Sequence, residues 1–294
     1  MKNAGIATIA IIGLGEVGRA YARALHDAGC ELRLCDPRPA PAASELAAQW
    51  QRPIHASIGP WLAECGWIFS CVTGAHALAV VEQALPHAAT GTTLCDLTTA
   101  SPDTKRAAAR RAGATALRYV DVAIMGAVNL SRHRTPLLAA GAGARDFAAL
   151  LGRAEGRVEV IDGGAAGDAI ALKILRSVFT KGMEALSVEL LMAAEKQGVR
   201  EQLYAQLRDI DETPLRTFID MLVRTHVVHA RRRAHEVHDA AAELAKHGLP
   251  SRVLPGVESR FALTIADLEA APPEQAEPGI DQALQWLLER SAQA

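Results

Sequence analysis

A glycine-rich turn near the start of the chain constrains its fold more than any other feature. The turn follows an apolar run over residues 7–12, precedes a helical pattern, and reads Gly13-Leu14-Gly15-Glu16-Val17-Gly18. In this context Gly13 permits the tight bend, Gly15 lets the backbone approach a pyrophosphate, and Gly18 lets the helix pack closely on the strand. The N–H groups at the helix N-terminus favour the phosphates. The turn therefore predicts a dinucleotide cofactor at residues 13–17.

Short apolar runs alternate with alanine-rich amphipathic segments as far as residue 161. This alternation is typical of β-α-β units on a mainly parallel, doubly wound sheet whose strands are covered on both faces. The expected strands are residues 7–12, 31–35, 67–72, 92–96, 118–122, 137–140 and 158–161. The predicted fold class is therefore an α/β Rossmann domain.

The pattern changes after Gly163 and Gly164, where strand-like runs stop and helical periodicity continues to the end of the chain. The longest expected helix covers residues 168–196 and would be about 44 Å long at 1.5 Å per residue, enough to leave one domain and enter the next. We therefore predict an NAD(P)-binding Rossmann domain over residues 1–163 and an all-helical domain over residues 164–294.

Composition limits the possible functions. The chain has 31 basic and 33 acidic residues and only 4% aromatic residues, which disfavours nucleic acid and anionic membrane as partners. No apolar run approaches the roughly 20 residues of a membrane span, and the first one is broken too early for a secretory signal. The five cysteines form no C-x-x-C pair and suggest neither disulfides nor zinc. We expect a cytoplasmic protein that acts on a small molecule and binds no metal.

Asp36 directly follows the second expected strand, 18 positions after Gly18. A carboxylate at this place accepts hydrogen bonds from both hydroxyls of an adenosine ribose and repels the 2′-phosphate of NADP. NAD is therefore favoured, but Arg38 offers a positive charge to a 2′-phosphate, so NADP stays open. The alternative for Asp36 is a turn-forming role before Pro37.

Two more loops lie where ligands of open α/β folds bind, at the carboxyl ends of strands. Val72 and Thr73 end the strand over 67–72, and Thr98 follows the strand over 92–96. Small and hydroxylated residues suit a ribose or a nicotinamide amide, so we assign Val72, Thr73 and Thr98 to the cofactor site. The alternative is an ordinary role in a turn or helix cap.

Lys173 and Ser177 share one face of the long expected helix. A lysine partly desolvated beside a nicotinamide can exchange a proton with a substrate hydroxyl, because burial and neighbours shift its pKa toward the working range. Taken alone, a lysine here more often extends its charge to water. The surrounding pattern favours the catalytic interpretation.

Nearly the whole chain resembles the β-hydroxyacid dehydrogenase superfamily, which includes 3-hydroxyisobutyrate dehydrogenase and 6-phosphogluconate dehydrogenase. The glycine turn and the helix with Lys173 carry this resemblance together with two segments, Asp96-Leu97-Thr98-Thr99-Ala100-Ser101-Pro102 and Asp121-Val122-Ala123-Ile124-Met125-Gly126-Ala127. More narrowly, residues 173–186 and 232–236 resemble a phosphogluconate-dehydrogenase-like subgroup. The resemblance implies that Lys173 is the general acid/base, that residues 125–128 face the substrate, and that the helical domain closes the cleft and forms a homodimer.

Two positions depart from the family pattern. Members carry Ser-Gly-Gly where this chain has Met125-Gly126-Ala127, and they carry Asn where it has Ser177. In the family that Ser and that Asn help hold the substrate's carboxylate and hydroxyl, so we do not expect a small carboxylate to be held in the usual way. Ser177 supplies one hydroxyl but not the two ends of an amide.

Two basic clusters remain. Arg132, His133 and Arg134 follow the substrate-facing segment and form a candidate cationic lip for a carboxylate or phosphate, because arginine offers a bidentate fork. The alternative is a solvated basic turn. The second cluster, around Arg231–Arg233 in the helical region, is expected to form mainly a hydrated face and salt bridges between subunits. The alternative is that His229, Arg232, Arg233 and Glu236, which share a helix face, reach the active site.

Together these features predict an NAD(P)-dependent dehydrogenase that acts on the CH–OH group of a β-hydroxyacid-like substrate. Lys173 takes or returns the hydroxyl proton, and Ser177 orients the reacting oxygen. The predicted substrate-binding residues are Met125, Gly126, Ala127, Arg132 and His133. Two alternatives stay open: imine reduction on the same architecture, against which Lys173 argues, and a noncatalytic NAD-binding regulator.

Overall fold

The computed structural model describes residues 7–292. The chain divides into two compact units, of which the first ends at Val178 and the second begins at Phe179.

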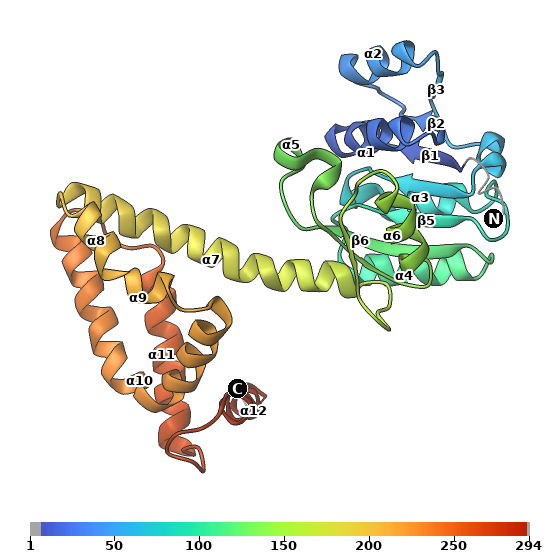
Figure 1. Ribbon diagram of the computed structural model, residues 1–294. Coiled ribbons are helices and arrows are strands. Elements are labelled where there is room, and N and C mark those ends of the chain that lie inside the picture. The colour runs from blue at the N-terminus through green and yellow to red at the C-terminus, as the bar shows by residue number, and fades with distance from the viewer. Residues whose placement is uncertain (1–6, 293–294) are drawn as a thin grey trace. The chain divides into compact units, whose positions relative to one another are not determined.

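The first unit contains one eight-stranded sheet with the strand order β3-β2-β1-β4-β5-β6-β7-β8 (Figure 1). The strands are β1 (Thr8–Ile12), β2 (Glu31–Cys35), β3 (Ile54–His55), β4 (Trp67–Ser70), β5 (Thr93–Asp96), β6 (Arg118–Ile124), β7 (Leu137–Ala140) and β8 (Val158–Val160). All neighbours pair in parallel except β6 and β7, which are antiparallel. The predicted Rossmann-like α/β fold is confirmed. The additional strand, β3, is only two residues long and too short to leave an apolar run in the sequence.

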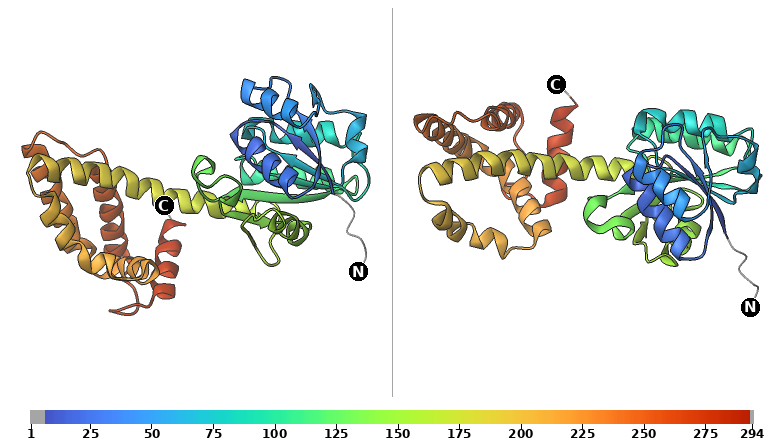
Figure 2. Two further views of the ribbon diagram at one scale, coloured as in Figure 1. Left: turned by 45° about the horizontal axis from the view of Figure 1, so that its top comes forward. Right: turned by 90° about the horizontal axis from the view of Figure 1, so that it is seen from above.

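Helices cover both faces of this sheet (Figure 2). They are α1 (Glu16–Asp27), α2 (Pro41–Gln49), α3 (Ala77–Ala84), α4 (Pro102–Gly113), α5 (Val128–Ser131) and α6 (Ala144–Gly152). Because side chains alternate along a strand, β1 contributes to two cores at once. Ile9 and Ile11 pack into one core with Phe147 of α6, whereas Ile12 packs into the other with Val81 of α3. Burial on both faces explains why residues 9–12 of β1 are all apolar.

Helix α7 (Asp168–Lys196) is the long helix that the sequence predicts. The predicted domain boundary at Gly163 and Gly164 precedes this helix, whereas the compact units divide inside it, after Val178. The first three turns of α7 therefore belong with the sheet, and they carry Lys173 and Ser177.

The second unit is helical and contains the rest of α7. It also contains α8 (Arg200–Gln206), α9 (Arg208–Asp211), α10 (Leu215–Lys246), α11 (Leu254–Ala270) and α12 (Ile280–Ser291). Its core includes Val227 of α10 with Ala283 and Trp286 of α12. Over residues 7–292, no helix is both long enough and apolar enough to cross a membrane.

The basic cluster of α10 is exposed and pairs largely with acidic residues of its own unit. Arg231 lies 2.9 Å from Glu269 of α11, and Arg232 pairs with Glu236 one turn along α10. These contacts agree with the hydrated face that the sequence predicts. The predicted salt bridges between subunits stay a prediction.

Candidate active site

The three glycines of the turn differ in what surrounds them. Gly13 has a φ of +90°, and a Cβ added there would lie 2.8 Å from the carbonyl oxygen of Cys71. A Cβ on Gly18 would lie 1.9 Å from the carbonyl oxygen of Gly13. Both glycines are therefore required by the fold itself. At Gly15, the N-cap of α1, no described atom beyond the two adjoining residues lies within 4 Å of such a Cβ. Gly15 leaves open space in front of the helix N-terminus, as an approaching phosphate requires.

A groove of about 530 Å³ lies beside this turn, at the carboxyl ends of β1, β2 and β4. It brings together predicted cofactor residues from three separate loops, namely Gly13, Gly15, Asp36, Arg38, Val72 and Thr73. Apolar side chains, among them Ile58 and Val80, line it as well. The groove thus joins an anion-attracting helix N-terminus to an apolar surface suited to a planar ring.

The carboxylate of Asp36 is fixed at the rim of this groove. One of its oxygens accepts a hydrogen bond from the backbone N–H of Leu14 at 2.8 Å, and the other accepts one from the backbone N–H of Arg38 at 2.9 Å. A carboxylate has about four lone-pair positions, so each oxygen retains room for a ligand hydroxyl. Asp36 therefore acts in the turn and faces the groove at the same time.

The remaining predicted cofactor residues lie elsewhere. Leu14 is 1% exposed, so only its backbone takes part, through Asp36. Thr98 is 2% exposed, and its hydroxyl accepts a hydrogen bond from the N–H of Ala100 inside its own loop. Val17 packs partly against the core, and Glu16 faces a second hollow described below. The structure does not bring these four side chains to the groove.

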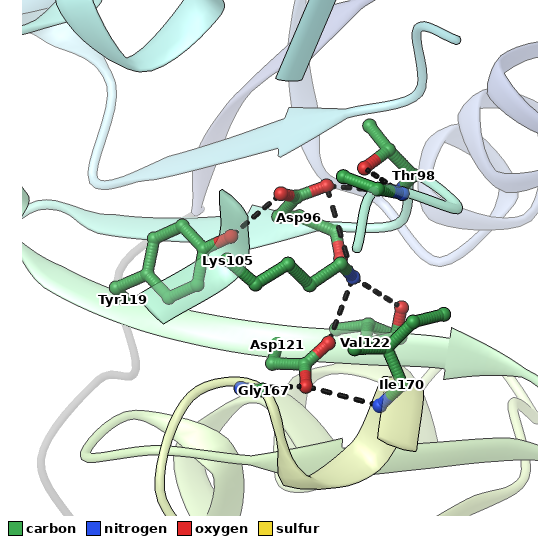
Figure 3. Close-up of polar contacts among 9 residues, drawn as sticks. Asp96, Thr98, Lys105, Tyr119, Asp121, Val122, Gly167 and Ile170 are labelled. Atoms are coloured by element: carbon green, nitrogen blue, oxygen red, sulfur yellow. Dashed lines mark hydrogen bonds and ion pairs between the residues drawn. The ribbon is translucent and has the colours of Figure 1, made fainter. Parts of the chain in front are cut away.

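A buried polar network lies in the first unit, where β5, β6, α4 and the N-terminus of α7 meet (Figure 3). At its centre is Lys105 of α4, which is 0% exposed. Its ammonium lies 2.7 Å from a carboxylate oxygen of Asp121. It also donates hydrogen bonds to the backbone carbonyls of Asp96, at 2.9 Å, and Val122, at 3.1 Å. The buried charge is thus surrounded by oxygens from the end of β5 and the middle of β6.

The two carboxylates of this network hold further groups. Asp121 accepts hydrogen bonds at its other oxygen from the N–H groups of Gly167 and Ile170, at 3.0 and 3.1 Å. These groups belong to the N-terminal turn of α7, whose N–H groups have no partner inside the helix. Asp96 accepts a 2.6 Å hydrogen bond from the Tyr119 hydroxyl, and burial together with this carboxylate raises the pKa of Tyr119 well above its usual value.

Lys105 and Tyr119 are absent from the site predicted from sequence, although α4 contains a signal for one of them. The buried residues of α4 are Lys105, Ala108 and Ala112, which follow the spacing of a single helix face. A lysine on the same face as buried alanines is a lysine that must find partners inside the protein.

Lys173 is half-buried on the first part of α7. Burial lowers the pKa of its amine, and the positive charge of Lys105 lowers it further. Ser177 lies one turn along, and its hydroxyl donates a 2.9 Å hydrogen bond to the carbonyl oxygen of Lys173. The two residues share a helix face as predicted, but the hydroxyl of Ser177 bonds to its own helix.

The predicted substrate segment follows β6. Met125 is half-buried and donates its N–H to the Pro136 carbonyl at 2.8 Å, whereas Gly126 and Ala127 are exposed. Arg132 adopts a φ of +50°, which is strained for a residue with a side chain.

Arg132 lines a second hollow, of about 490 Å³, between α1 and the segment after β6. Its lining is Glu16, Arg19, Ala20, Arg23, Val128, Asn129 and Arg132. Arg134 instead pairs with Glu155, and His133 is half-buried. The predicted cationic lip is therefore divided, and only its first arginine meets basic residues of α1.

Comparison with known proteins gives two matches to family models. Residues 8–151 match the NAD binding domain of 6-phosphogluconate dehydrogenase, and residues 194–264 match a domain of unknown function, DUF1932. A curated relative, an uncharacterized 28.5 kDa protein in the 7S RNA 5′ region of Methanothermus fervidus, is 29% identical over 148 residues. That match covers 49% of this chain and 55% of the relative, so the chain spans about half of the relative's length.

Solved structures match over almost the entire chain. One is a conserved protein of unknown function described as structurally similar to 3-hydroxyacid dehydrogenases. It is 27% identical to this chain, and the match covers 96% of this chain and 99% of that protein with a TM-score of 0.61. Another is an imine reductase from Aspergillus terreus in complex with NADPH4 and dibenz[c,e]azepine. It is 18% identical to this chain, and the match covers 96% of this chain and 99% of the reductase with a TM-score of 0.74. At that identity the likeness concerns the fold alone.

Proposed function

The chain belongs to the β-hydroxyacid dehydrogenase-like superfamily, and on that premise we propose that it is an NAD(P)-dependent dehydrogenase acting on the CH–OH group of a β-hydroxyacid-like substrate. One observation carries the proposal. Lys173 is a half-buried lysine with a lowered pKa, and it lies in the same compact unit as the dinucleotide groove. Such a lysine can serve as the general acid/base of alcohol oxidation, because a lowered pKa lets its amine lose and regain a proton more readily than that of an exposed lysine.

The residues of the groove fit a dinucleotide. The open space at Gly15 and the N–H groups of α1 suit the pyrophosphate, and Asp36 suits the adenosine ribose. When bound, the nicotinamide supplies or accepts the hydride.

The proposed cofactor is NAD. The two backbone N–H groups that bond to Asp36 keep its negative charge beside the ribose position, where it would repel a 2′-phosphate. Arg38 is exposed on the same rim, so NADP is the competing cofactor in the assay below.

Lys173 has one task in each direction of the proposed reaction. In oxidation its neutral amine takes the proton of the substrate hydroxyl, and in reduction its ammonium returns that proton to the oxygen. Ser177 must turn its hydroxyl away from the carbonyl of Lys173 to orient the same oxygen. Met125 adds an apolar wall in place of the hydroxyl that family members carry there.

A substrate panel tests this function directly. We expect the protein to oxidise at least one β-hydroxyacid, with a higher kcat/KM for NAD than for NADP, measured by the absorbance of the reduced cofactor. Imine reduction is the second candidate, supported by the fold shared with an imine reductase and by the apolar Met125. Turnover of cyclic imines alone would replace the proposal by this candidate. Tight cofactor binding without any turnover would indicate a regulator.

Arg132 is proposed to hold the anionic group of the substrate, with Arg19 and Arg23 adding positive charge to the same hollow. Replacing Arg132 by alanine should raise the KM for substrate by roughly 10- to 100-fold and change kcat little, because charged hydrogen bonds contribute about 1.5–3 kcal/mol. The matched control is Arg134→Ala, which removes an arginine already paired with Glu155. Equal KM values for the two variants would contradict the assignment.

A homodimer formed through the helical region is also proposed. Helix α7 exposes large apolar side chains on both of its halves, including Leu175 at 65%, Val178 at 70% and Met192 at 53%. Soluble monomers rarely leave so much apolar surface in water. Light scattering on the purified chain should therefore give twice the mass of 31.2 kDa. A monomer mass at micromolar concentration would contradict this proposal.

A further inference from the structure

Lys105 is a buried charge that the proposed mechanism does not use. A fully buried ammonium is costly unless it is paired and hydrogen-bonded, and lysine is rarely buried without such partners. Lys105 meets this requirement with one carboxylate, Asp121, and two backbone carbonyls. A second carboxylate, that of Asp96, lies 3.9 Å from the ammonium.

The partners of Lys105 connect three parts of the candidate site (Figure 3). The Asp96 carbonyl ends β5, before the loop with Thr98. The Val122 carbonyl lies in β6, which leads to the substrate segment at Met125. Asp121 continues the connection to α7, because its second oxygen accepts the N–H groups of Gly167 and Ile170.

We propose that Lys105 is a positioning residue for Lys173, because its ion pair with Asp121 holds the first turn of α7 against the middle of β6, beside the carboxyl end of β5. The proposal rests on the proposed function in one respect, because that function is what assigns a proton transfer to Lys173. Lys173 lies one turn beyond Ile170 on the same helix, so the place of its amine follows the place of that first turn. Asp121 thereby connects one lysine to the helix that carries the other.

The charges of the network also act on Lys173. The ammonium of Lys105 lowers the pKa of Lys173. Lys105 itself faces Asp96 from β5, Asp121 from β6 and the N-terminal turn of α7 through Asp121, while Tyr119 bonds to Asp96. Removal of the ammonium should therefore make Lys173 harder to deprotonate, and removal of the Asp121 charge should make it easier.

The test compares Lys105→Met with Asp121→Asn in the full-length protein. The readout is the pH dependence of covalent labelling of the Lys173 amine by an acylating reagent, followed by mass spectrometry. We expect the labelling midpoint to move to higher pH in Lys105→Met, which removes a positive charge, and to lower pH in Asp121→Asn, which removes a negative charge. Arg110→Met, on the exposed face of α4, is the matched control and should leave the midpoint unchanged.

Two further measurements separate the possible outcomes. Both variants should lower the melting temperature. A merely structural role of Lys105 predicts that the labelling midpoint of Lys173 does not shift, or that it shifts in the same direction in both variants. Either result would overturn the proposal. If Lys105→Met does not fold, the test rests on the other two variants. The labelling midpoint must then move to lower pH in Asp121→Asn and stay unchanged in Arg110→Met for the proposal to stand. The labelling of Lys173 needs no turnover. An active Lys173→Ala variant would therefore refute the proposed function, whereas the effect of Lys105 on the labelling midpoint would still stand.

Discussion

Replacing Lys173 by alanine is expected to lower turnover by about 10²- to 10⁴-fold, the usual contribution of a positioned acid/base group. Lys173 does not line the dinucleotide groove, so the dissociation constant of NAD measured by calorimetry should stay within about threefold of wild type. The matched control is Lys181→Ala, which removes an exposed lysine of the same helix that pairs with Glu184. Turnover within tenfold of wild type in Lys173→Ala would show that another group transfers the proton.

The same experiment has a pH dependence whose sign follows from the structure. Burial and the charge of Lys105 lower the pKa of Lys173, so its neutral form is present at lower pH than for an exposed lysine. Oxidation uses the neutral amine, so its rate should rise with pH through this lowered pKa. Reduction uses the ammonium and should fall over the same range. Both dependences should disappear in Lys173→Ala.

Replacing Gly15 by alanine should weaken NAD binding by tenfold or more while the apoprotein stays folded. No described atom beyond the two adjoining residues lies within 4 Å of the added Cβ, so the methyl group meets only the space that a pyrophosphate would occupy. Alanine is a poorer N-cap than glycine, which should lower the melting temperature by about 2–4 °C at most. Calorimetry with NAD and thermal unfolding without it measure the two effects separately.

Gly18→Ala is the contrasting variant for this experiment. Its Cβ would lie 1.9 Å from the carbonyl oxygen of Gly13, so the backbone must move and the apoprotein should lose about 3 kcal/mol or more of stability. The two neighbouring glycines thus separate a binding effect from a folding effect. Unchanged NAD affinity in Gly15→Ala would mean that the phosphates do not approach this turn.

Most of the Rossmann fold can be predicted from local patterns in the sequence. The glycine turn identifies β1 and α1 because its spacing is characteristic of a strand, a tight turn and a helix in succession, and the apolar runs identify strands because both faces of the sheet are buried. Asp36 is likewise predictable from a local pattern, because it follows the second strand at the distance from the glycine turn where a ribose-binding carboxylate lies. The resemblance to the β-hydroxyacid dehydrogenase superfamily rests on longer motifs, and the matches over residues 8–151 and 194–264 support it.

Other residues depend on long-range packing that local patterns do not report. Thr98 and Arg134 have the right chemistry for a ligand, but Thr98 bonds within its own loop and Arg134 pairs with Glu155. The two-residue strand β3 exists only because β2 offers it an edge to pair with.

The sequence by itself determined the fold class, the glycine turn, Asp36 and the helix that carries Lys173, because each depends on residues close together in the chain. The tertiary structure decided that Lys105 is buried, that Asp121 holds the start of α7, and that two lysines on different helices affect each other. Those relations arise because β5, β6, α4 and α7 converge at one point, where charged groups from distant positions must satisfy one another away from water.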